Sequence, residues 1–391
     1  MKKLREVYLD NNATTRVDER VIRYMNKFFR NDYAVASSQF SHAPGIRAKE
    51  GIDLARHIIS KRINCDVEEL VFTSGATESN NLAIKGLAMS NQDSKRNKII
   101  ISGVEHFSVL QSAQSLEKSG FKVETVNVNN QGFVDIESLK KLVDEKTLLV
   151  SIIAGNNEVG TVQDIKSIAE ISHKVGAIFH TDAAVLFMQG QIDVQEQEID
   201  MMSITAHKIY GPKGVGALYV KRGTKIEKII DGGYQEFNFR SGTENVSGIA
   251  GFGKAVEIYS DEETKKIRSL RDYLYEQIKN NISEVELNGA EDFNKRIPNN
   301  LNVSFKYIEG ESVVLHLDMR GIAVVTGSAC FSRALQASHI LLAMGFSHER
   351  AHGSIRFSLS KYNTKDDIDY TVNQLKEVVE NLRNLSPIKE V

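Results

Sequence analysis

The chain has 391 residues, of which 41% are hydrophobic and 26% charged, as in a globular protein with more than one domain. Its formal net charge is −2 with acids and bases interspersed, which argues against a nucleic-acid or anionic-membrane surface. No apolar run approaches the roughly 20 residues of a membrane helix. The two cysteines, Cys65 and Cys330, form neither a disulfide framework nor a Cys-x-x-Cys metal motif. We expect a reduced, cytoplasmic protein without membrane or nucleic-acid partners.

Short apolar runs alternate with helical patterns over the first two thirds of the chain. Helical patterns over residues 19–28 and 45–63 come first. Strand-like runs follow at residues 70–72, 98–101, 122–126, 148–153, 177–180, 201–205 and 216–220. Most are separated by helical spacing, as at 79–89 and 165–175. This alternation predicts an α/β fold with a mostly parallel sheet covered on both faces, and such sheets bind ligands at the carboxyl ends of their strands.

The pattern changes from about Asp261. A charged helical pattern over residues 262–281 precedes short apolar runs at 300–305, 322–325 and 354–359. Further helical patterns cover residues 311–319, 337–344 and 365–382. We expect a large domain over residues 15–260 and a smaller α+β domain formed by residues 1–14 and 261–391.

Polar residues follow several of the predicted strands. Lys208 stands just after the run 201–205, and a lysine at such a strand end can form a Schiff base with an aldehyde, especially where burial lowers its pKa. For an isolated His-Lys pair, a solvated lysine beside a turn is the more ordinary interpretation. The segment 73–81 follows a strand and opens a helix, where Gly75 permits a tight turn and the free N–H groups suit a phosphate. Ordinary helix caps share this pattern, and the Gly-x-Gly-x-x-Gly dinucleotide motif is absent.

His106, Asn157 and Asp182 follow other strands. Taken singly, each has a structural explanation, although a carboxylate such as Asp182 is costly to bury without a cation. Together with Lys208 and the phosphate motif they match the needs of pyridoxal phosphate. Its aldehyde requires an amine, and its ring nitrogen requires an acidic partner.

With these motifs the chain resembles the cysteine desulfurases of the IscS/NifS type, in the fold type I group of pyridoxal-phosphate-dependent transferases. The resemblance runs from residues 8–15 to residues 383–387. Its most specific motifs are residues 73–81, 156–161, 206–214, 240–245 and 326–330.

The resemblance implies a role for each matching residue. Lys208 carries the cofactor and moves the substrate α-proton, Asp182 pairs with the ring nitrogen, and His106 stacks on the ring. The phosphate is held by Ala76, Thr77, Thr205 and His207, with Thr243 supplied by the partner chain of a homodimer. Asn157 contacts cofactor and substrate, and Arg356 clamps the substrate carboxylate with its bidentate guanidinium. The residues around Arg356 alone favour an outward side chain on an edge strand.

Cys330 resembles the family's sulfur acceptor. The implied reaction converts L-cysteine to L-alanine and leaves the sulfur on Cys330 as a persulfide, for transfer to an iron–sulfur scaffold or another acceptor protein. A thiolate is required, and a free thiol of pKa ~8.5 is only a minor fraction thiolate at neutral pH. No resident metal is expected, although Cys330 could hold a transferred cluster transiently. Cys65 matches no family motif. A selenocysteine lyase and a weakly active or non-catalytic partner in cluster assembly stay open as alternatives.

Three departures from the family pattern concern Val185, Tyr234 and residues 37–40. Val185 stands where the family has a glutamine that donates to the cofactor's phenolic oxygen. Losing one such hydrogen bond costs ~1 kcal/mol, or less than one pKa unit. Tyr234 replaces a glycine, and residues 37–40 replace an Asn-Pro-Ser-Ser run. We expect these changes to alter turnover and substrate access rather than cofactor binding.

Overall fold

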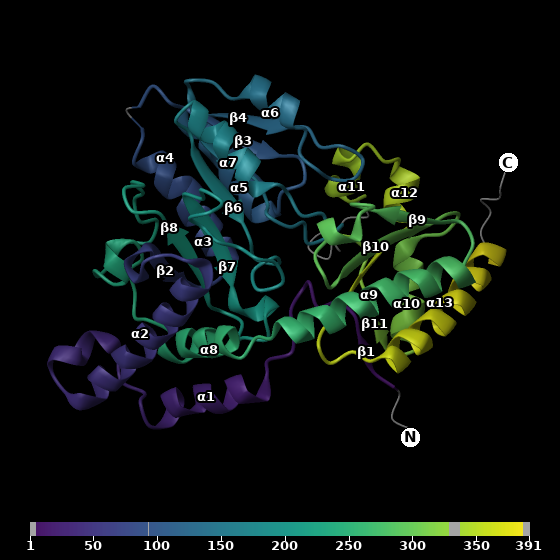
Figure 1. Cartoon of the computed structure of the whole chain (residues 1–391), viewed down its shortest axis with the longest axis horizontal. Helices are drawn as coiled ribbons and strands as arrows, with labels where there is room; N and C mark the ends of the chain where they lie inside the picture. Colours follow the sequence, from purple (N-terminus) through teal and green to yellow (C-terminus); the bar gives the residue numbers. More distant parts are fainter. Residues whose placement is uncertain (1–4, 93, 328–336, 386–391) are drawn as a thin grey trace.

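The computed structural model describes residues 5–92, 94–327 and 337–385. Figure 1 shows a larger part built around a central sheet and a smaller part toward the C-terminus. The long helix α9 (Asp261–Asn281) begins at the junction of the two parts and lies along the smaller one. Ser260 caps the start of α9, and three acidic residues occupy its first turn, where they favour the positive end of the helix dipole.

The central sheet has seven strands in the order β2-β8-β7-β6-β5-β3-β4. In chain order their bounds are β2 (Leu70–Thr73), β3 (Lys98–Ser102), β4 (Lys122–Val126), β5 (Thr147–Ser151), β6 (Ile178–Asp182), β7 (Met201–Thr205) and β8 (Gly216–Val220). All neighbouring strands are parallel except β8, which is antiparallel to both β2 and β7. The seven predicted strands and the α/β class with a mostly parallel sheet are therefore confirmed.

Both faces of this sheet are buried, because successive side chains of a strand point to opposite faces. In β3, Ile100 belongs to one apolar cluster, while Ile99 and Ile101 belong to another. The α-helices of the larger part are α1 (Glu19–Arg30), α2 (Ala43–Ile63), α3 (Ala76–Asn81), α4 (Leu87–Met89), α5 (Phe107–Ser115), α6 (Ile136–Leu142), α7 (Ile165–Lys174) and α8 (Val246–Glu257). A π-helical turn, η3 (Leu82–Gly86), joins α3 to α4.

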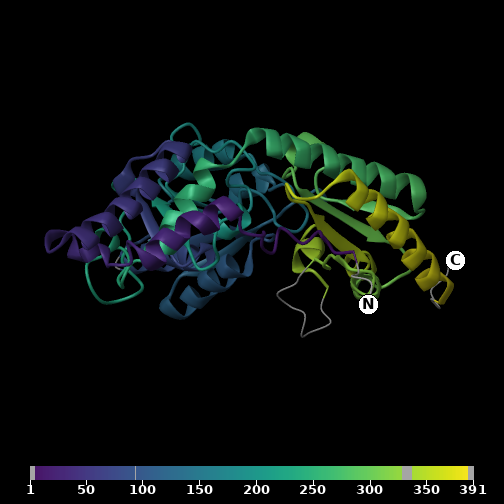
Figure 2. The same cartoon turned by 90° about the horizontal axis from the view of Figure 1, so that it is seen from below.

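The smaller part contains a three-stranded antiparallel sheet in the order β12-β10-β9 and a separate parallel pair, β1-β11. These strands are β1 (Val7–Tyr8), β9 (Val285–Asn288), β10 (Asn300–Phe305), β11 (Ile322–Ala323) and β12 (Ser354–Ser358). The remaining α-helices are α10 (Gly310–Asp318), α11 (His339–Ala343), α12 (His348–His352) and α13 (Lys365–Leu385). Figure 2 shows α9 and α13 lying together along this part, where both contribute to a third apolar cluster.

Some local predictions need correction. The run 322–325 forms a strand only at its first two residues, and the helix predicted over 337–344 covers Ile340 and its neighbours from His339 to Ala343 only. Short 3₁₀ turns not foreseen are η1 (Ala36–Phe40), η2 (Val67–Glu69), η4 (Leu116–Ser119), η5 (Ala206–Lys208), η6 (Glu236–Asn238) and η7 (Phe293–Lys295). Within the described ranges, no helix is long and apolar enough to cross a membrane.

Candidate active site

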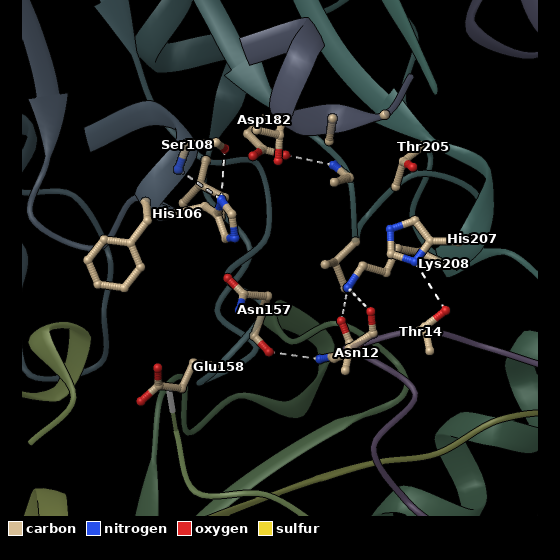
Figure 3. Close-up of a pocket in the computed structure, with 18 of the residues that line it drawn as sticks. Asn12, Thr14, His106, Ser108, Asn157, Glu158, Asp182, Thr205, His207 and Lys208 are labelled. Carbon is tan, nitrogen blue, oxygen red and sulfur yellow. Dashed lines mark hydrogen bonds between the residues drawn. The ribbon is translucent and has the colours of Figure 1, made fainter. Parts of the chain in front are cut away.

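A cavity of about 650 Å³ lies where the strands of the central sheet end, against the smaller part of the molecule. Its walls bring together most of the residues expected to bind cofactor and substrate. These are Ala76, Thr77, His106, Asn157, Asp182, Thr205, His207, Lys208 and Arg356. Figure 3 shows His106, just before α5, and Lys208, in the turn after β7, directed into the same hollow, with Asp182 at its edge.

One end of the cavity suits an anion. The helix α3 begins at Gly75, whose φ of +149° is a backbone conformation that favours glycine, and no side chain of the described residues caps this helix start. Thr205 lines the same end at the close of β7. His207 is hydrogen-bonded to the hydroxyl of Thr14 at 3.2 Å, and burial, reinforced by Lys208, lowers the pKa of His207 to about 4. Uncapped N–H groups, hydroxyls and a neutral imidazole can all hydrogen-bond a phosphate.

Lys208 lies in the short turn η5, directly after the central strand β7. Its Nζ donates to the carbonyl oxygen of Ala13 at 2.8 Å and also contacts the carbonyl of Asn12. The N-terminal segment therefore meets the amine inside the cavity (Figure 3). The interpretation of Lys208 as a solvated surface lysine is wrong.

Asp182 ends the neighbouring strand β6 and is only 4% exposed. Its Oδ1 accepts the backbone N–H of Ala184 at 2.9 Å, and its Oδ2 accepts Nδ2 of Asn80 at 2.7 Å. No ion pair between described residues includes this carboxylate, although burial without a cation is costly. A cationic ring nitrogen in the cavity would supply the missing partner.

His106 precedes α5, and its Nδ1 receives the backbone N–H of Ser108 at 3.1 Å as a helix cap. The hydroxyl of Ser108 lies 2.7 Å from the same nitrogen. Burial lowers the pKa of His106, an effect that Asp182 opposes and Lys208 reinforces. A neutral imidazole beside the cavity fits a ring-stacking role.

Arg356, on β12, lines the cavity from the smaller part and is 3% exposed. Its Nη2 bonds Oδ1 of Asp10 at 2.6 Å, and its Nη1 donates to the carbonyl oxygen of Asn157 at 3.3 Å. Its Nε is buried without a hydrogen-bond partner among the described residues. β12 is an edge strand, as the sequence pattern around Arg356 predicts, but the predicted outward side chain is wrong, and the guanidinium is available to a carboxylate.

One described candidate residue, Thr243, is not brought to this cavity. Thr243 is exposed and is absent from the cavity wall. Cys330 lies outside the described residues, although Gly327 and His339, on either side of that gap in the description, both line the cavity. Cys65 packs elsewhere, against the main apolar cluster, and burial raises the pKa of its thiol to about 12, as expected for a bystander. Among the described residues, no three His, Cys, Asp or Glu side chains are grouped to hold a metal ion.

The sequence interpretation missed several polar residues in or behind the cavity. These are Asp10, Asn12, Thr14, Asn80, Glu105, Ser108, Glu158 and His339. Glu105 and Glu158 are fully buried, and burial raises their pKa values to about 8 and about 7. Most of these residues lie within or next to the motifs quoted above. Their position beside a motif was the one feature of the sequence that could have indicated them.

Comparison with known proteins agrees with this geometry. Residues 7–371 match the family model described as "Aminotransferase class-V", and the chain belongs to this family. It is 46% identical over 389 residues to "Cysteine desulfurase IscS" of Dictyoglomus turgidum, covering 99% of this chain and 98% of the relative. It is 46% identical over 384 residues to "Cysteine desulfurase IscS 1" of Archaeoglobus fulgidus, covering 97% and 99%. A solved structure titled "NIFS-LIKE PROTEIN" superposes with a TM-score of 0.89 at 38% identity, covering 97% of this chain and 100% of that one.

Proposed function

We propose that this chain is a pyridoxal-phosphate-dependent cysteine desulfurase, which converts L-cysteine to L-alanine and leaves the sulfur on Cys330 as a persulfide for iron–sulfur cluster assembly. The observation that carries the proposal is the single cavity in which Lys208, Asp182 and Arg356 meet. An amine, a buried carboxylate and a guanidinium fit an aldehyde cofactor and an amino-acid substrate. The similarity to proteins named cysteine desulfurase over nearly their whole length supports the same activity.

The residues fit the cofactor on features of the structure itself. The uncapped start of α3, with Thr77, Thr205 and His207 beside it, would hold the phosphate. Asp182, which has no cationic partner among the described residues, would hold the protonated ring nitrogen. When bound, pyridoxal phosphate withdraws electrons from the substrate α-carbon.

The chain's own groups would then handle substrate and protons. Arg356 and Asn157 orient the substrate through its carboxylate, and the amine of Lys208 takes and returns the proton at the α-carbon. The buried walls around Asp182 exclude water from the reacting atoms. A thiolate at Cys330 would take the sulfur, and the acceptor that receives it next would be an iron–sulfur scaffold or another sulfur-carrying protein.

The division into domains at residues 15–260, and 1–14 with 261–391, is part of the proposal. Separate apolar clusters around the seven-stranded and three-stranded sheets support it.

A homodimer in a reduced cytoplasm is likewise proposed. Phe29, Tyr33 and Phe40 are 60%, 74% and 92% exposed, and such aromatic residues suit an interface with a second copy. Thr243, exposed in the single chain, would reach the partner's phosphate. Light scattering coupled to size-exclusion chromatography measures the mass in solution, which should be that of two chains.

The test is to incubate the purified chain with pyridoxal phosphate and L-cysteine, and to measure alanine and the mass of the Cys330 peptide. We expect alanine to form and one sulfur to be added to that peptide. Lys208→Ala should abolish both, whereas the surface variant Lys221→Ala should match the parent. A Cys330→Ser variant should lose the added sulfur.

Three results would contradict the proposal. A protein that takes up no cofactor would favour a non-catalytic partner in cluster assembly. A strong preference for selenocysteine would favour a selenocysteine lyase. An added sulfur found only outside the Cys330 peptide would exclude the assigned acceptor.

A further inference from the structure

A chain of hydrogen bonds runs behind the cavity wall from Asp182 to His106. Nδ2 of Asn80 lies 2.7 Å from Oδ2 of Asp182 and 2.8 Å from Oγ of Ser108. Oγ of Ser108 in turn lies 2.7 Å from Nδ1 of His106. Asn80 is fully buried and is not part of the cavity wall, so it meets neither substrate nor cofactor. The two residues that flank the expected ring are therefore joined through a third that the ligand never touches.

Only one assignment of donors and acceptors is consistent along this series of hydrogen bonds. An ionised carboxylate only accepts, so the Asn80 amide presents its NH₂ group to Asp182, and its second hydrogen points to Ser108. The Ser108 hydroxyl, having accepted there, donates its own hydrogen to Nδ1 of His106. The backbone N–H of Ser108, which can only donate, also meets Nδ1 at 3.1 Å. Nδ1 therefore carries no hydrogen, and the neutral ring holds its hydrogen on Nε2.

This arrangement leaves one polar atom unsatisfied. Within the part of the chain that the structure describes, Oδ1 of Asn80 is buried with no hydrogen-bond partner. Turning the amide over would place that oxygen against the Asp182 carboxylate, where two acceptors repel each other. An unpartnered buried carbonyl is unfavourable, so packing alone does not explain an asparagine at this position. What the asparagine provides is a pair of donors to two functional side chains.

We propose that Asn80, with Ser108 as its relay, is a positioning residue that keeps Asp182 an acceptor and fixes His106 as the neutral tautomer with hydrogen on Nε2. Its catalytic consequence rests on the proposed function, because Asp182 and His106 are there the partners of the cofactor ring. The charged and titratable groups that face His106 are Asp182, Lys208 and His339. A proton on Nδ1 would point at the hydroxyl and the backbone N–H of Ser108, which both donate to that nitrogen. The network therefore disfavours a charged imidazole.

The tautomer can be read directly by NMR on the full-length protein labelled with ¹⁵N-histidine, before and after adding pyridoxal phosphate. A His106→Gln variant identifies the signal. In the parent we expect an unprotonated Nδ1, a protonated Nε2 and no titration of this ring near neutral pH. Asn80→Ala and Ser108→Ala leave the backbone N–H of Ser108 in place but remove the obligatory donation from the Ser108 hydroxyl to Nδ1. A fraction of the other tautomer should therefore appear, and the midpoint of His106 should rise by roughly 0.5–1 pH unit, the scale of one hydrogen bond.

Controls separate positioning from folding. Ser115→Ala removes a hydroxyl at the far end of the same helix, where it bonds only the backbone of Ser112, and should leave the His106 signal unchanged. Ser108→Thr keeps the hydroxyl and should restore the parent tautomer. In the active enzyme, Asn80→Ala should lower kcat about tenfold with little change in KM. If Asn80→Ala does not fold, the Ser108→Ala and Ser108→Thr pair decides.

Two results would overturn the proposal. One is a hydrogen on Nδ1 of His106 in the parent, and the other is a tautomer that neither Asn80→Ala nor Ser108→Ala disturbs. Should the NMR results come out as expected in a protein that releases no alanine from cysteine, the proposed function falls while the network stands.

Discussion

Arg356 and Asp10 form a largely buried ion pair, with 2.6 Å between Nη2 and Oδ1, that ties the N-terminal segment to the cavity. The carboxylate holds one end of the guanidinium fork, and the carbonyl of Asn157 holds another nitrogen. The fork is therefore oriented before any substrate arrives. A preoriented arginine binds a carboxylate without first losing side-chain freedom.

The first prediction concerns that fork. Arg356→Lys keeps the charge but cannot serve Asp10 and a substrate carboxylate together, since an ammonium is a single point charge. A charge-assisted hydrogen bond contributes about 1.5–3 kcal/mol, so KM for L-cysteine should rise roughly 10- to 100-fold. Cofactor uptake, followed by visible absorbance, should not change. Arg23→Lys, on the exposed face of α1, is the control. An unchanged KM would remove Arg356 from the substrate site.

The sheet and the residues at its strand ends could be predicted from the sequence, because apolar runs of strand length recur with polar residues just after them. Lys208 and Asp182 were found in this way. The supporting contacts could not be predicted. Asn80 lies inside a quoted motif, but its partner Asp182 is 102 positions away.

Asp10 and Arg356 are separated by 346 positions. Such pairs depend on the order of strands in the sheet and on how the two parts of the chain meet, and no local spacing encodes either. The burial of Arg356 was missed for the same reason. Its strand has an ordinary edge pattern, and segments distant in sequence cover it. Asn11 and Asn12 bond to Ser358, and the backbone N–H of Arg356 donates to the carbonyl of Val325.

The second prediction concerns Val185, which lines the cavity and offers no hydrogen-bond donor. In Val185→Gln, an amide that reaches the cofactor's ionised oxygen stabilises it. The pH midpoint of the holoenzyme's visible absorbance should then move to lower pH, by less than about one unit. Val185→Met, similar in length but without a donor, should leave the midpoint in place. Equal shifts in both variants would point to crowding of this buried wall instead.

The third prediction concerns Glu105, which is fully buried with Oε1 accepting the backbone N–H of Ile153 at 2.8 Å. Burial raises its pKa from 4.5 to about 8. Between those values the folded chain holds a proton that the unfolded chain has released, so stability falls as pH rises through this window. Above about pH 8 the penalty is constant.

Glu105→Gln keeps the acceptor and cannot ionise, so its Tm should exceed that of the parent at pH 9 and approach it at pH 5. Burial raises the pKa of Glu158 to about 7. The Tm of Glu105→Gln should therefore still fall between pH 4.5 and 7, but less steeply than the Tm of the parent. Scanning calorimetry at pH 5, 7 and 9 measures both effects, with exposed Glu68→Gln as the control. Parallel pH profiles for Glu105→Gln and the parent would mean that Glu105 is ionised in the fold.

The fourth prediction concerns the junction between the larger and the smaller part. Nζ of Lys361 lies 2.6 Å from Oδ2 of Asp18, with both side chains less than a tenth exposed, and 4.4 Å from the ring centre of Tyr210. Lys361→Met leaves the Asp18 carboxylate with Arg20 as its remaining partner. Breaking one side of a buried pair costs about 3 kcal/mol or more, so the urea midpoint should fall clearly.

Adding Asp18→Asn to Lys361→Met should recover part of that loss. Asparagine still caps α1, where the Asp18 side chain accepts the N–H of Arg20, and position 18 no longer carries a buried charge without its lysine. Part of the loss should persist, because Lys361 also lies 3.4 Å from Oε2 of Glu263, which keeps its charge in the double variant. The double-mutant cycle therefore separates the ion pair from the helix cap. Losses that simply add would show that Lys361 stabilises the junction through Tyr210 or Glu263 rather than through Asp18.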